Sequence, residues 1–492
     1  MASQYRSILK ATSIFGGTQI LQMLIQIIRT KFVALLVGAT GMGLSSMYMS
    51  SLTMFVTIFG MGINMSVVRD LSKANEEGDD ERFSLVVKVF ERMLLFLSVC
   101  GTLFVIATSS LLSNWSFGTN EHTLDYCFLS VIVLFTLLTQ GNTARMIGKR
   151  KVKDVALSSL IGSLVTLLTS VPFFYFWRLD GIVPGLIVST IANYLITMVF
   201  AQRVKLTPIR VCFRDTKSYG LSILSLGFTM VLASLLGNIT VYLINVSITR
   251  LGGIQDLGFF NAGMSITQQV VSLVFAAMAA DYYPRLVASL KELDQMNETI
   301  NQQTEILLYL STPILCAFSI FSIFIIQVLL SNEFLVLNTF IRILCFGMFF
   351  KVMSYALGYV SFAKGDKKIY LILEGCVGNA LNILFSVLFY YLWGLKGIAY
   401  AFVCNYLVYL TIIYIVDKNR YQYKISLSIL RPLVVNLSFV SIILFFDWLL
   451  TGWHYYSVAI ATLVLTILYN TNKLNNKTRI ISFVREKINR NL

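Results

Sequence analysis

Charged residues are scarce in this chain, where they make up 13% of 492 residues, whereas soluble proteins carry about 25%. Histidine is scarcer still, because only His122 and His454 occur. A histidine-based metal site or a Ser–His triad therefore has almost nothing to build on. The seven cysteines are scattered, form no CxxC pair and mostly lie in apolar runs, so we interpret them as packing residues. The sequence predicts no enzyme, no cofactor and no metal site.

Apolar residues, by contrast, make up 57% of the chain, and the mean hydropathy is +0.75. Runs of about 20 apolar residues, the length that crosses a bilayer as a helix, recur along most of the chain. We expect an all-α polytopic membrane protein with about fourteen transmembrane helices. The expected spans are 12–37, 44–68, 89–112, 126–147, 155–177, 182–202, 219–249, 258–280, 304–330, 336–361, 369–393, 398–416, 427–447 and 454–470.

The net charge of +15 comes from 39 Lys and Arg against 24 Asp and Glu. Most of the basic residues fall in alternate loops, which the positive-inside rule assigns to the cytoplasm, so we expect no nucleic-acid partner. The basic loops are 69–82, 149–153, 203–217, 364–368 and 418–424, and the opposite loops hold only Arg178, Arg250 and Lys396. All five tryptophans then lie at outer ends of spans, and both termini are predicted to be cytoplasmic.

Short segments recur in the chain at a nearly constant spacing. The matches are VGATGMGL (37–44) with GGIQDLGF (252–259), GKRK (148–151) with GDKK (365–368), and WRLDGI (177–182) with WGLKGI (393–398), at offsets of 215 to 217. Six spans per lobe is an even number, so the two lobes share one orientation in a parallel repeat. We predict an N-terminal six-helix lobe (1–203), a cytoplasmic linker (204–218), a C-terminal six-helix lobe (219–420), and two additional transmembrane helices with a basic cytoplasmic tail (421–492).

The first span carries polar residues at a depth where a bilayer makes them expensive. Gln19, Gln22, Gln26 and Arg29 fall within about 80° of one another on a helix, whereas Lys31 points elsewhere. Arg29 lies nine residues from the glycine that ends the span. That is roughly 13 Å of rise, so Arg29 is near mid-bilayer. An arginine at that depth is expected to face a hydrophilic cavity.

Three further spans each have one polar face. The second span has hydroxyl side chains spaced i, i+4, i+7 and i+11, the eighth span repeats them at an offset of 215, and the seventh span has a similar stripe. Their residues are Ser46, Ser50, Thr53 and Thr57; Asn261, Ser265 and Gln268; and Asn238 and Asn245. Such residues also join helices in bilayers, which is the alternative interpretation. The matched stripes favour a hydrophilic cavity between the lobes, lined by spans one, two, seven and eight.

Other charges within spans give weaker indications. Arg342 and Lys351 both lie in the tenth span, nine residues apart and so on opposite faces. The alternatives for each are to snorkel, to pair with another charge or to contact substrate. Glu374, near the inner end of the eleventh span, is a candidate for ion coupling.

Two segments resemble those of a known family. They are IIRTKFVALLVGATGMGL (27–44), similar to the first-span signature of oligosaccharide flippases, and GFFNAGMSITQQVVSLVFAAMAADYYPRL (258–286), similar to their eighth span. The SFAKGDKK turn (361–368) is also like theirs. Over about residues 1–420, the chain resembles the O-antigen and polysaccharide flippases of the multidrug/oligosaccharidyl-lipid/polysaccharide exporter superfamily.

This resemblance implies two six-helix lobes that work by alternating access in the bacterial inner (cytoplasmic) membrane. The implied substrate is an undecaprenyl-pyrophosphate-linked oligosaccharide, moved from the cytoplasmic to the periplasmic leaflet, and the implied partners are membrane lipids and other polysaccharide assembly proteins. Arg29 is the main candidate to bind the pyrophosphate, with Lys31, Arg342 and Lys351 as secondary candidates. The amides and hydroxyls of the stripes would bind the sugar.

The end of the eighth span carries a further set of expectations. Asp281, Pro284 and Arg285 lie at its cytoplasmic end, where we predict a gating or structural role rather than contact with substrate. Pro284 is predicted to end that helix.

The alternatives are a multidrug exporter of the same superfamily, a peptidoglycan lipid II flippase, and a scaffold or receptor without a polar cavity. Transport of cationic drugs favours carboxylates in the cavity, but here the first acidic residue is Asp70, at the inner end of span two. A lipid II flippase is expected to place several arginines in its first lobe, whereas only Arg29 and Lys31 lie deep in spans one and two.

Overall fold

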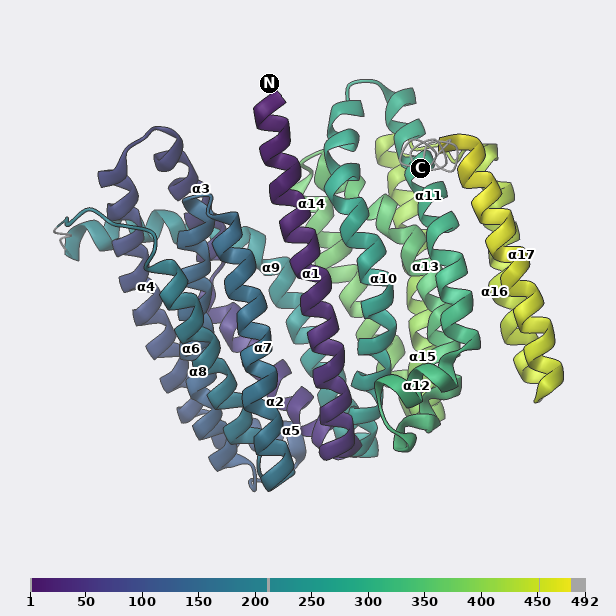
Figure 1. Ribbon diagram of the computed structural model, residues 1–492, viewed down its shortest axis with the longest axis horizontal. Coiled ribbons are helices and arrows are strands. Elements are labelled where there is room, and N and C mark those ends of the chain that lie inside the picture. Colours follow the sequence, from purple (N-terminus) through teal and green to yellow (C-terminus); the bar gives the residue numbers. More distant parts are fainter. Residues whose placement is uncertain (1, 210–212, 451, 479–492) are drawn as a thin grey trace, which may run out of the picture. The chain divides into compact units, whose positions relative to one another are not determined.

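The computed structural model describes residues 2–209, 213–450 and 452–478, and the regular structure in these ranges is entirely helical (Figure 1). By its internal contacts the chain divides into two units, Met1–Asn261 with Leu329–Ser331, and Ala262–Val328 with Asn332–Leu492. The first unit contains α1 (Ala2–Leu36), α2 (Gly38–Gly60), α3 (Ile63–Glu76), α4 (Asp80–Ala107), α5 (Ser109–Phe117), α6 (Thr123–Gly148), α7 (Val152–Trp177), α8 (Ile182–Ala201), α9 (Phe213–Gly252) and the start of α10 (Ile254–Ser289). The second unit contains the rest of α10, α11 (Leu293–Ile320), α12 (Ser322–Leu329), η1 (Asn332–Leu337), α13 (Asn338–Ala363), α14 (Lys367–Tyr370), η2 (Leu371–Val377), α15 (Gly378–Tyr421), α16 (Leu427–Leu449) and α17 (Trp453–Thr478).

Eleven helical segments among the described residues are long and apolar enough to cross a membrane. One of them, Lys367–Tyr421, is 55 residues long and holds two predicted spans, because its helical conformation breaks at Gly394. In addition, α10 and α17, with 36 and 26 residues, cover the predicted spans at 258–280 and 454–470. The predicted all-α polytopic membrane protein is confirmed.

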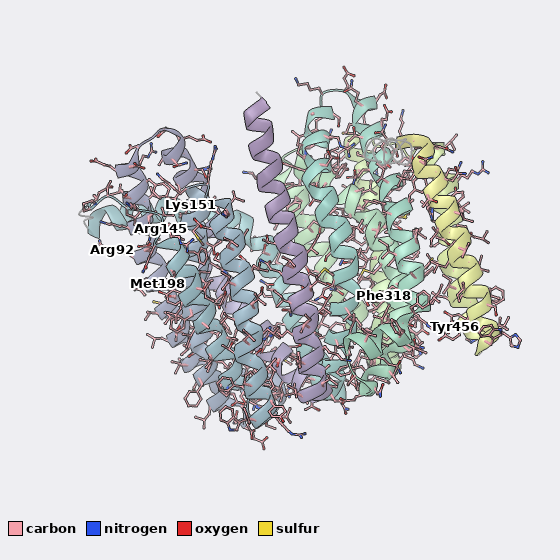
Figure 2. The ribbon with its side chains drawn as sticks, in the orientation of Figure 1. Arg92, Arg145, Lys151, Met198, Phe318 and Tyr456 are labelled. Atoms are coloured by element: carbon pink, nitrogen blue, oxygen red, sulfur yellow. The ribbon has the colours of Figure 1, made fainter. Side chains whose placement is uncertain are left out.

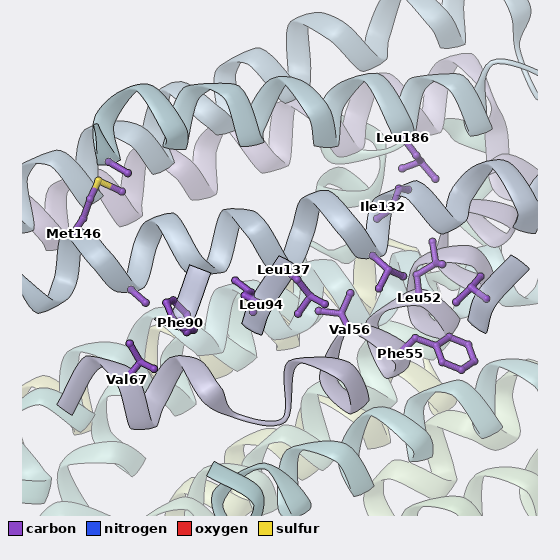
Figure 3. Close-up of a cluster of buried hydrophobic side chains, with 14 of the residues drawn as sticks. Leu52, Phe55, Val56, Val67, Phe90, Leu94, Ile132, Leu137, Met146 and Leu186 are labelled. Atoms are coloured by element: carbon purple, nitrogen blue, oxygen red, sulfur yellow. The ribbon is translucent and has the colours of Figure 1, made fainter. Parts of the chain in front are cut away.

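The core of the first unit is a cluster of buried apolar side chains (Figure 3). It draws Phe55 from α2, Val67 from α3, Phe90 from α4, Leu137 from α6 and Leu186 from α8. Around this core α4 packs against α6, α6 against α8, and α7 against both α8 and α1. The remaining faces of these helices are also apolar, as expected where the neighbour is lipid. The cluster therefore fixes helices that carry the predicted polar stripe of α2.

Basic side chains gather at one end of the first unit, where Figure 2 shows Arg92, Arg145 and Lys151 close together. Arg145 pairs with Glu91, with 3.2 Å between Nη1 and Oε1. Lys151 donates a hydrogen bond to the carbonyl oxygen of Arg203 at 3.0 Å. These contacts tie together the loops that the sequence assigns to the cytoplasmic side.

The second unit has its own core. Tyr282 and Leu286 of α10, Met296 and Ile300 of α11, and Tyr409 of α15 are all buried in one cluster. α13 packs against α15 and α11, and α11 also packs against α16 and α17. The last two helices, predicted to lie outside the repeat, are thus part of the packed structure of this unit.

The internal repeat is visible in the backbone as left-handed turns at matching positions. Gly38, between α1 and α2, has a φ of 64°, and Gly253, between α9 and α10, has a φ of 94°. Arg150, between α6 and α7, has a φ of 56°, and Gly365, between α13 and α14, has a φ of 69°. Both pairs are 215 residues apart. Left-handed turns are rare, so their recurrence at one offset supports the predicted parallel repeat.

The turn before α14 is held by an aspartate. Asp366 accepts hydrogen bonds from Arg420 Nε at 2.8 Å, Tyr421 Oη at 3.1 Å and the Ile369 amide at 3.3 Å. Desolvation raises the pKa of Asp366, but these hydrogen bonds outweigh it and hold the pKa below its usual range. The carboxylate therefore stays charged and caps α14 at neutral pH.

A third matched turn leads to a stability prediction. Arg178, after α7, has φ 48° and ψ −120°, and Gly394, 216 residues later, has φ 59° and ψ −141°. Only glycine adopts this conformation without strain, and for other residues the strain is about 1–3 kcal/mol. Arg178→Gly is therefore expected to raise the thermal stability of the purified protein in detergent, and Gly394→Ala to lower it. Arg178→Ala is the control, because it removes the exposed side chain but keeps the strain. Equal melting temperatures for the glycine and alanine variants of Arg178 would contradict the prediction.

Candidate functional site

The polar face predicted for α1 is present, and it meets α7. Gln19 and Gln26 are exposed, and Gln22 and Arg29 are half-buried. Arg29 Nε donates a hydrogen bond to Ser170 Oγ on α7 at 3.4 Å, and Ser170 is fully buried. The structure thus gives Arg29 a neutral hydroxyl as its protein partner.

Arg29 differs in this respect from other arginines within helices. Arg145 and Arg342 both pair with carboxylates, those of Glu91 and Asp447. Among the side chains that the structure describes, no carboxylate lies within ion-pairing distance of Arg29. A guanidinium has five N–H donors, so one long hydrogen bond leaves most of its capacity for an anion. Because a cation at this depth is costly, a helix retains it where it has a function.

Lys31 is held separately from Arg29. Its ammonium group donates a hydrogen bond to the carbonyl oxygen of Leu330, in the segment Leu329–Ser331 that groups with the first unit. The helical geometry predicted that the two cations point in different directions, and their different partners agree with that. Lys31 therefore serves as a matched comparison for Arg29.

Two hydrogen bonds join the stripes of α2, α9 and α10. Asn238 Nδ2 of α9 donates to Thr57 Oγ1 of α2 at 2.8 Å. Asn261 Nδ2 of α10 donates to Asn245 Oδ1 of α9 at 3.4 Å. Four residues that were assigned to one polar surface from periodicity alone are thus brought together in pairs.

The hydroxyls of α2 are partly satisfied by their own helix. Ser50 donates to the Met47 carbonyl at 3.0 Å, and Thr53 donates to the Met49 carbonyl at 2.6 Å. Thr53 is exposed, and Ser46 is half-buried. Each bonded hydroxyl keeps oxygen lone pairs that can accept further hydrogen bonds, so the face remains able to bind hydroxyl groups of a ligand.

The other predicted residues lie in the second unit. Ser265 is half-buried and Gln268 is exposed on α10. Lys351 of α13 lies over the rings of Tyr406 and Phe402, with its Nζ 5.4 Å and 5.9 Å from the centroids. These contacts describe a cation–π site for Lys351.

Glu374 lies in the same region of the second unit as Lys351. Its Oε1 accepts a hydrogen bond from Tyr409 Oη at 2.7 Å, and it is within electrostatic reach of Lys351. Glu374 sits in η2, which is a π-helix, and such turns are frequent at functional sites. Ion coupling through Glu374 stays a prediction.

Arg342 does not lie with the polar stripes, which corrects its predicted position. Its side chain is only 4% exposed and its Nη1 pairs with Asp447 of α16. Its Nε donates to the Ser319 carbonyl at 3.2 Å and to Ser322 Oγ at 3.1 Å, and the guanidinium lies over the Tyr455 ring of α17. The guanidinium is thus engaged by protein groups, so we assign Arg342 to packing rather than to a ligand.

The prediction that Pro284 ends its helix is wrong, because α10 continues through Pro284 to Ser289. Asp281 and Arg285 form an i, i+4 ion pair at 2.7 Å, and Arg285 also donates to Gln303 of α11 at 3.1 Å. One turn earlier, the buried Tyr282 donates to the Ala356 carbonyl of α13 at 2.8 Å. Contacts on both sides of the proline outweigh the loss of one backbone hydrogen bond.

The fold and the site together define a class of protein. Many apolar helices, a parallel internal repeat and polar faces within the spans are the features of a membrane transporter built from two related bundles. The sequence profile of a family described as polysaccharide biosynthesis protein matches residues 8–290, which is more than half of the chain. The chain belongs to this family.

Known proteins that resemble the chain are flippases and transporters. The Lipid III flippases of Escherichia coli (strain K12) and Shigella flexneri are each 22% identical over 400 residues, covering 78% of this chain and 91% of theirs. The structure of the Lipid II flippase MurJ in an inward closed conformation matches with a TM-score of 0.68 and 14% identity, over 94% of this chain and 98% of that one. An inward-facing multidrug resistance MATE family transporter of the MOP superfamily matches with a TM-score of 0.65 and 15% identity, over 81% and 94%. The structural matches show the fold, and with the family they make this chain a multi-pass flippase or transporter of the MOP superfamily.

Proposed function

We propose that the chain moves an undecaprenyl-pyrophosphate-linked oligosaccharide from the cytoplasmic to the periplasmic leaflet of the bacterial inner membrane by alternating access. The observation that carries this proposal is Arg29, a half-buried cation within a span whose described protein partner is the neutral hydroxyl of Ser170. The family and the curated Lipid III flippases support a lipid-linked saccharide as the class of substrate.

Each part of this substrate has a counterpart in the first unit. A pyrophosphate carries negative charge and presents several acceptor oxygens, which suit the unused N–H donors of Arg29. Sugar hydroxyls both donate and accept hydrogen bonds, as do the amides of Asn238 and Asn245 and the hydroxyl of Thr57. The exposed glutamines Gln19 and Gln26 continue this face along α1. We assign the headgroup to this face.

The test is transport in proteoliposomes with three substrates, each labelled on its headgroup. These are an undecaprenyl-pyrophosphate-linked oligosaccharide, peptidoglycan lipid II and a cationic drug. Transfer of the first alone supports the proposal. Transfer of lipid II alone would assign the chain to cell-wall synthesis, and transport of the drug alone would make it an exporter.

Arg29→Ala is expected to reduce transport of the oligosaccharide substrate at least tenfold at normal membrane abundance. Arg29→Lys should retain part of the activity, because an ammonium keeps the charge but loses the bidentate geometry. Lys31→Ala is the matched control, since it removes a neighbouring cation from another face of α1. If Arg29→Ala and Lys31→Ala transport equally well, the pyrophosphate assignment is wrong.

A further inference from the structure

A group of three titratable side chains closes the end of the first unit opposite its basic loops. Asp125, in the first turn of α6, accepts a hydrogen bond on Oδ2 from Tyr48 Oη of α2 at 2.5 Å. His122, the residue before α6, places Nδ1 2.8 Å from the same Oδ2 and 2.8 Å from Tyr48 Oη. Three polar atoms thus converge on one another.

Counting protons in this group fixes the state of the imidazole. The Tyr48 hydroxyl has one hydrogen, and it is directed to Asp125. If His122 Nδ1 carried no hydrogen, its lone pair would face the carboxylate oxygen, which is repulsive. The neutral ring therefore has its hydrogen on Nδ1 and donates it to Asp125. Its other nitrogen, Nε2, is left as the atom that can take up a further proton.

The surroundings hold the ring in place and leave it accessible. The His122 ring lies against the Phe117 ring, with 4.1 Å between centroids, and edge-on to Tyr48 at 6.0 Å. Tyr48 is buried, whereas the side chains of His122 and Asp125 are 27% and 34% exposed. A proton from solvent can thus reach the imidazole, and the resulting cation would lie beside a carboxylate.

The group is connected to α9 by a buried hydrogen-bond chain. Ser51 of α2 donates to Tyr126 Oη at 3.3 Å, Tyr126 donates to Ser116 Oγ at 3.0 Å, and Ser116 is 2.8 Å from Tyr242 Oη of α9. Tyr126 follows Asp125 directly on α6. A change at Asp125 is therefore transmitted to the packing of α2, α5, α6 and α9.

The other charged or titratable groups around this site are few among the described residues. Tyr48 faces the imidazole from α2, Asp125 and Tyr126 from α6, and Tyr242 and Arg250 come from α9, while Glu121 is the exposed neighbour in sequence. Arg250 is engaged with the carbonyl oxygens of Trp115 and Asn114 at the end of α5. Asp125 is thus the carboxylate bonded to His122.

We propose that His122, Asp125 and Tyr48 form a proton-binding site on the outer side of the membrane, and that proton uptake stabilises the packing of α2, α6 and α9 seen here. α6 is 26 residues long and its far end carries the basic loop at 149–151, so His122 lies on the side predicted to be outside. The use of this site in transport rests on the proposed function; the site itself does not. An acidic exterior would then favour one conformation of the transporter.

The test is the melting temperature of the purified full-length protein in detergent between pH 8 and pH 6. Imidazolium next to a carboxylate stabilises the fold at low pH, and this contribution is lost as the pH rises. The chain has only two histidines, so His454→Gln is a matched control. Wild type and His454→Gln should gain about 3 °C on acidification relative to His122→Gln. The same pH response in all three proteins would overturn the proposal.

A second variant covers the case in which His122→Gln does not fold. Asp125→Asn keeps the shape and removes the charge that stabilises the imidazolium, so it should lose the same pH response. An unchanged response in Asp125→Asn would also overturn the proposal. In proteoliposomes, lowering the external pH should change transport by wild type but not by His122→Gln. If wild type does not move the lipid-linked oligosaccharide, the proposed function fails, and the melting temperatures still decide the proton site.

Discussion

Gly43→Ala and Gly258→Ala are each expected to lower the thermal stability of the protein more than any other Gly→Ala change in α2 or α9. A Cβ on Gly43 would overlap the Ile254 carbonyl oxygen and lie 3.0 Å from the Gly258 nitrogen. A Cβ on Gly258 would overlap the Ala39 carbonyl oxygen and lie 3.0 Å from the Gly43 nitrogen. The obstacle in each case is backbone, which cannot rotate away, so α2 and the start of α10 would have to separate.

Overpacking of this kind costs about 1–3 kcal/mol when side chains can adjust, and more when they cannot. Gly237→Ala in α9 is the matched control, because no atom lies within 4 Å of its added Cβ. The measurement is thermal unfolding of the purified variants in detergent, together with their abundance in the membrane. The close contact would be refuted if Gly43→Ala and Gly258→Ala melt at the same temperature as Gly237→Ala.

The sequence identified these two glycines as repeat partners but not as neighbours. Gly43 and Gly258 are 215 residues apart, and so are Ala39 and Ile254, the residues whose carbonyls they approach. The contact is therefore symmetric: each glycine meets the repeat partner of the other's neighbour. An offset in sequence says that two segments are alike. It does not say which of their residues lie where the two copies touch.

Periodicity predicted faces well because a face depends on a single helix. Thr57 with Asn238, and Asn245 with Asn261, were assigned to polar stripes, and hydrogen bonds join both pairs. Partners from distant helices were not predictable in this way. Ser170, which accepts the hydrogen bond of Arg29, lies 141 residues later on α7, and nothing in its spacing indicates that α7 packs against α1.

His122 was overlooked for a related reason. Its scarcity excluded a catalytic or metal role, but one imidazole is enough for proton binding when another residue supplies the carboxylate. Asp125 lies three positions later and could have been noticed as a partner at the start of the helix. Tyr48 lies 74 residues earlier, so only the fold brings it to the pair.

Arg342 shows the opposite error, in which a charge within a span was assigned to ligand binding. Its partner Asp447 lies 105 residues later in α16, beyond the repeat. Asp447 precedes Trp448, and in sequence this pair indicates the end of a span at the membrane interface. The identity of the pair depends on α16 packing against α13, which no short-range pattern records.

Removing one partner of this ion pair is expected to be among the most destabilising single changes in the second unit. Asp447→Leu leaves the guanidinium of Arg342 buried without a counter-charge, which costs about 3–5 kcal/mol. Arg342→Met should be destabilising for the same reason, because Asp447 is 23% exposed and keeps only part of its hydration. The control is Glu76→Ala, which breaks the exposed pair with Arg150 and should change stability by no more than about 1 kcal/mol.

The double variant Arg342→Met/Asp447→Leu is the informative member of this series. Replacing both charges by apolar side chains removes the unpaired charge, so its stability should return close to that of wild type. Thermal unfolding of the four proteins then gives the coupling between α13 and α16. A double variant that is as unstable as the sum of the two single ones would mean that the pair is not coupled. A recovered double variant would show that α16 is held to this unit by packing, and that the buried charges need each other more than the fold needs them.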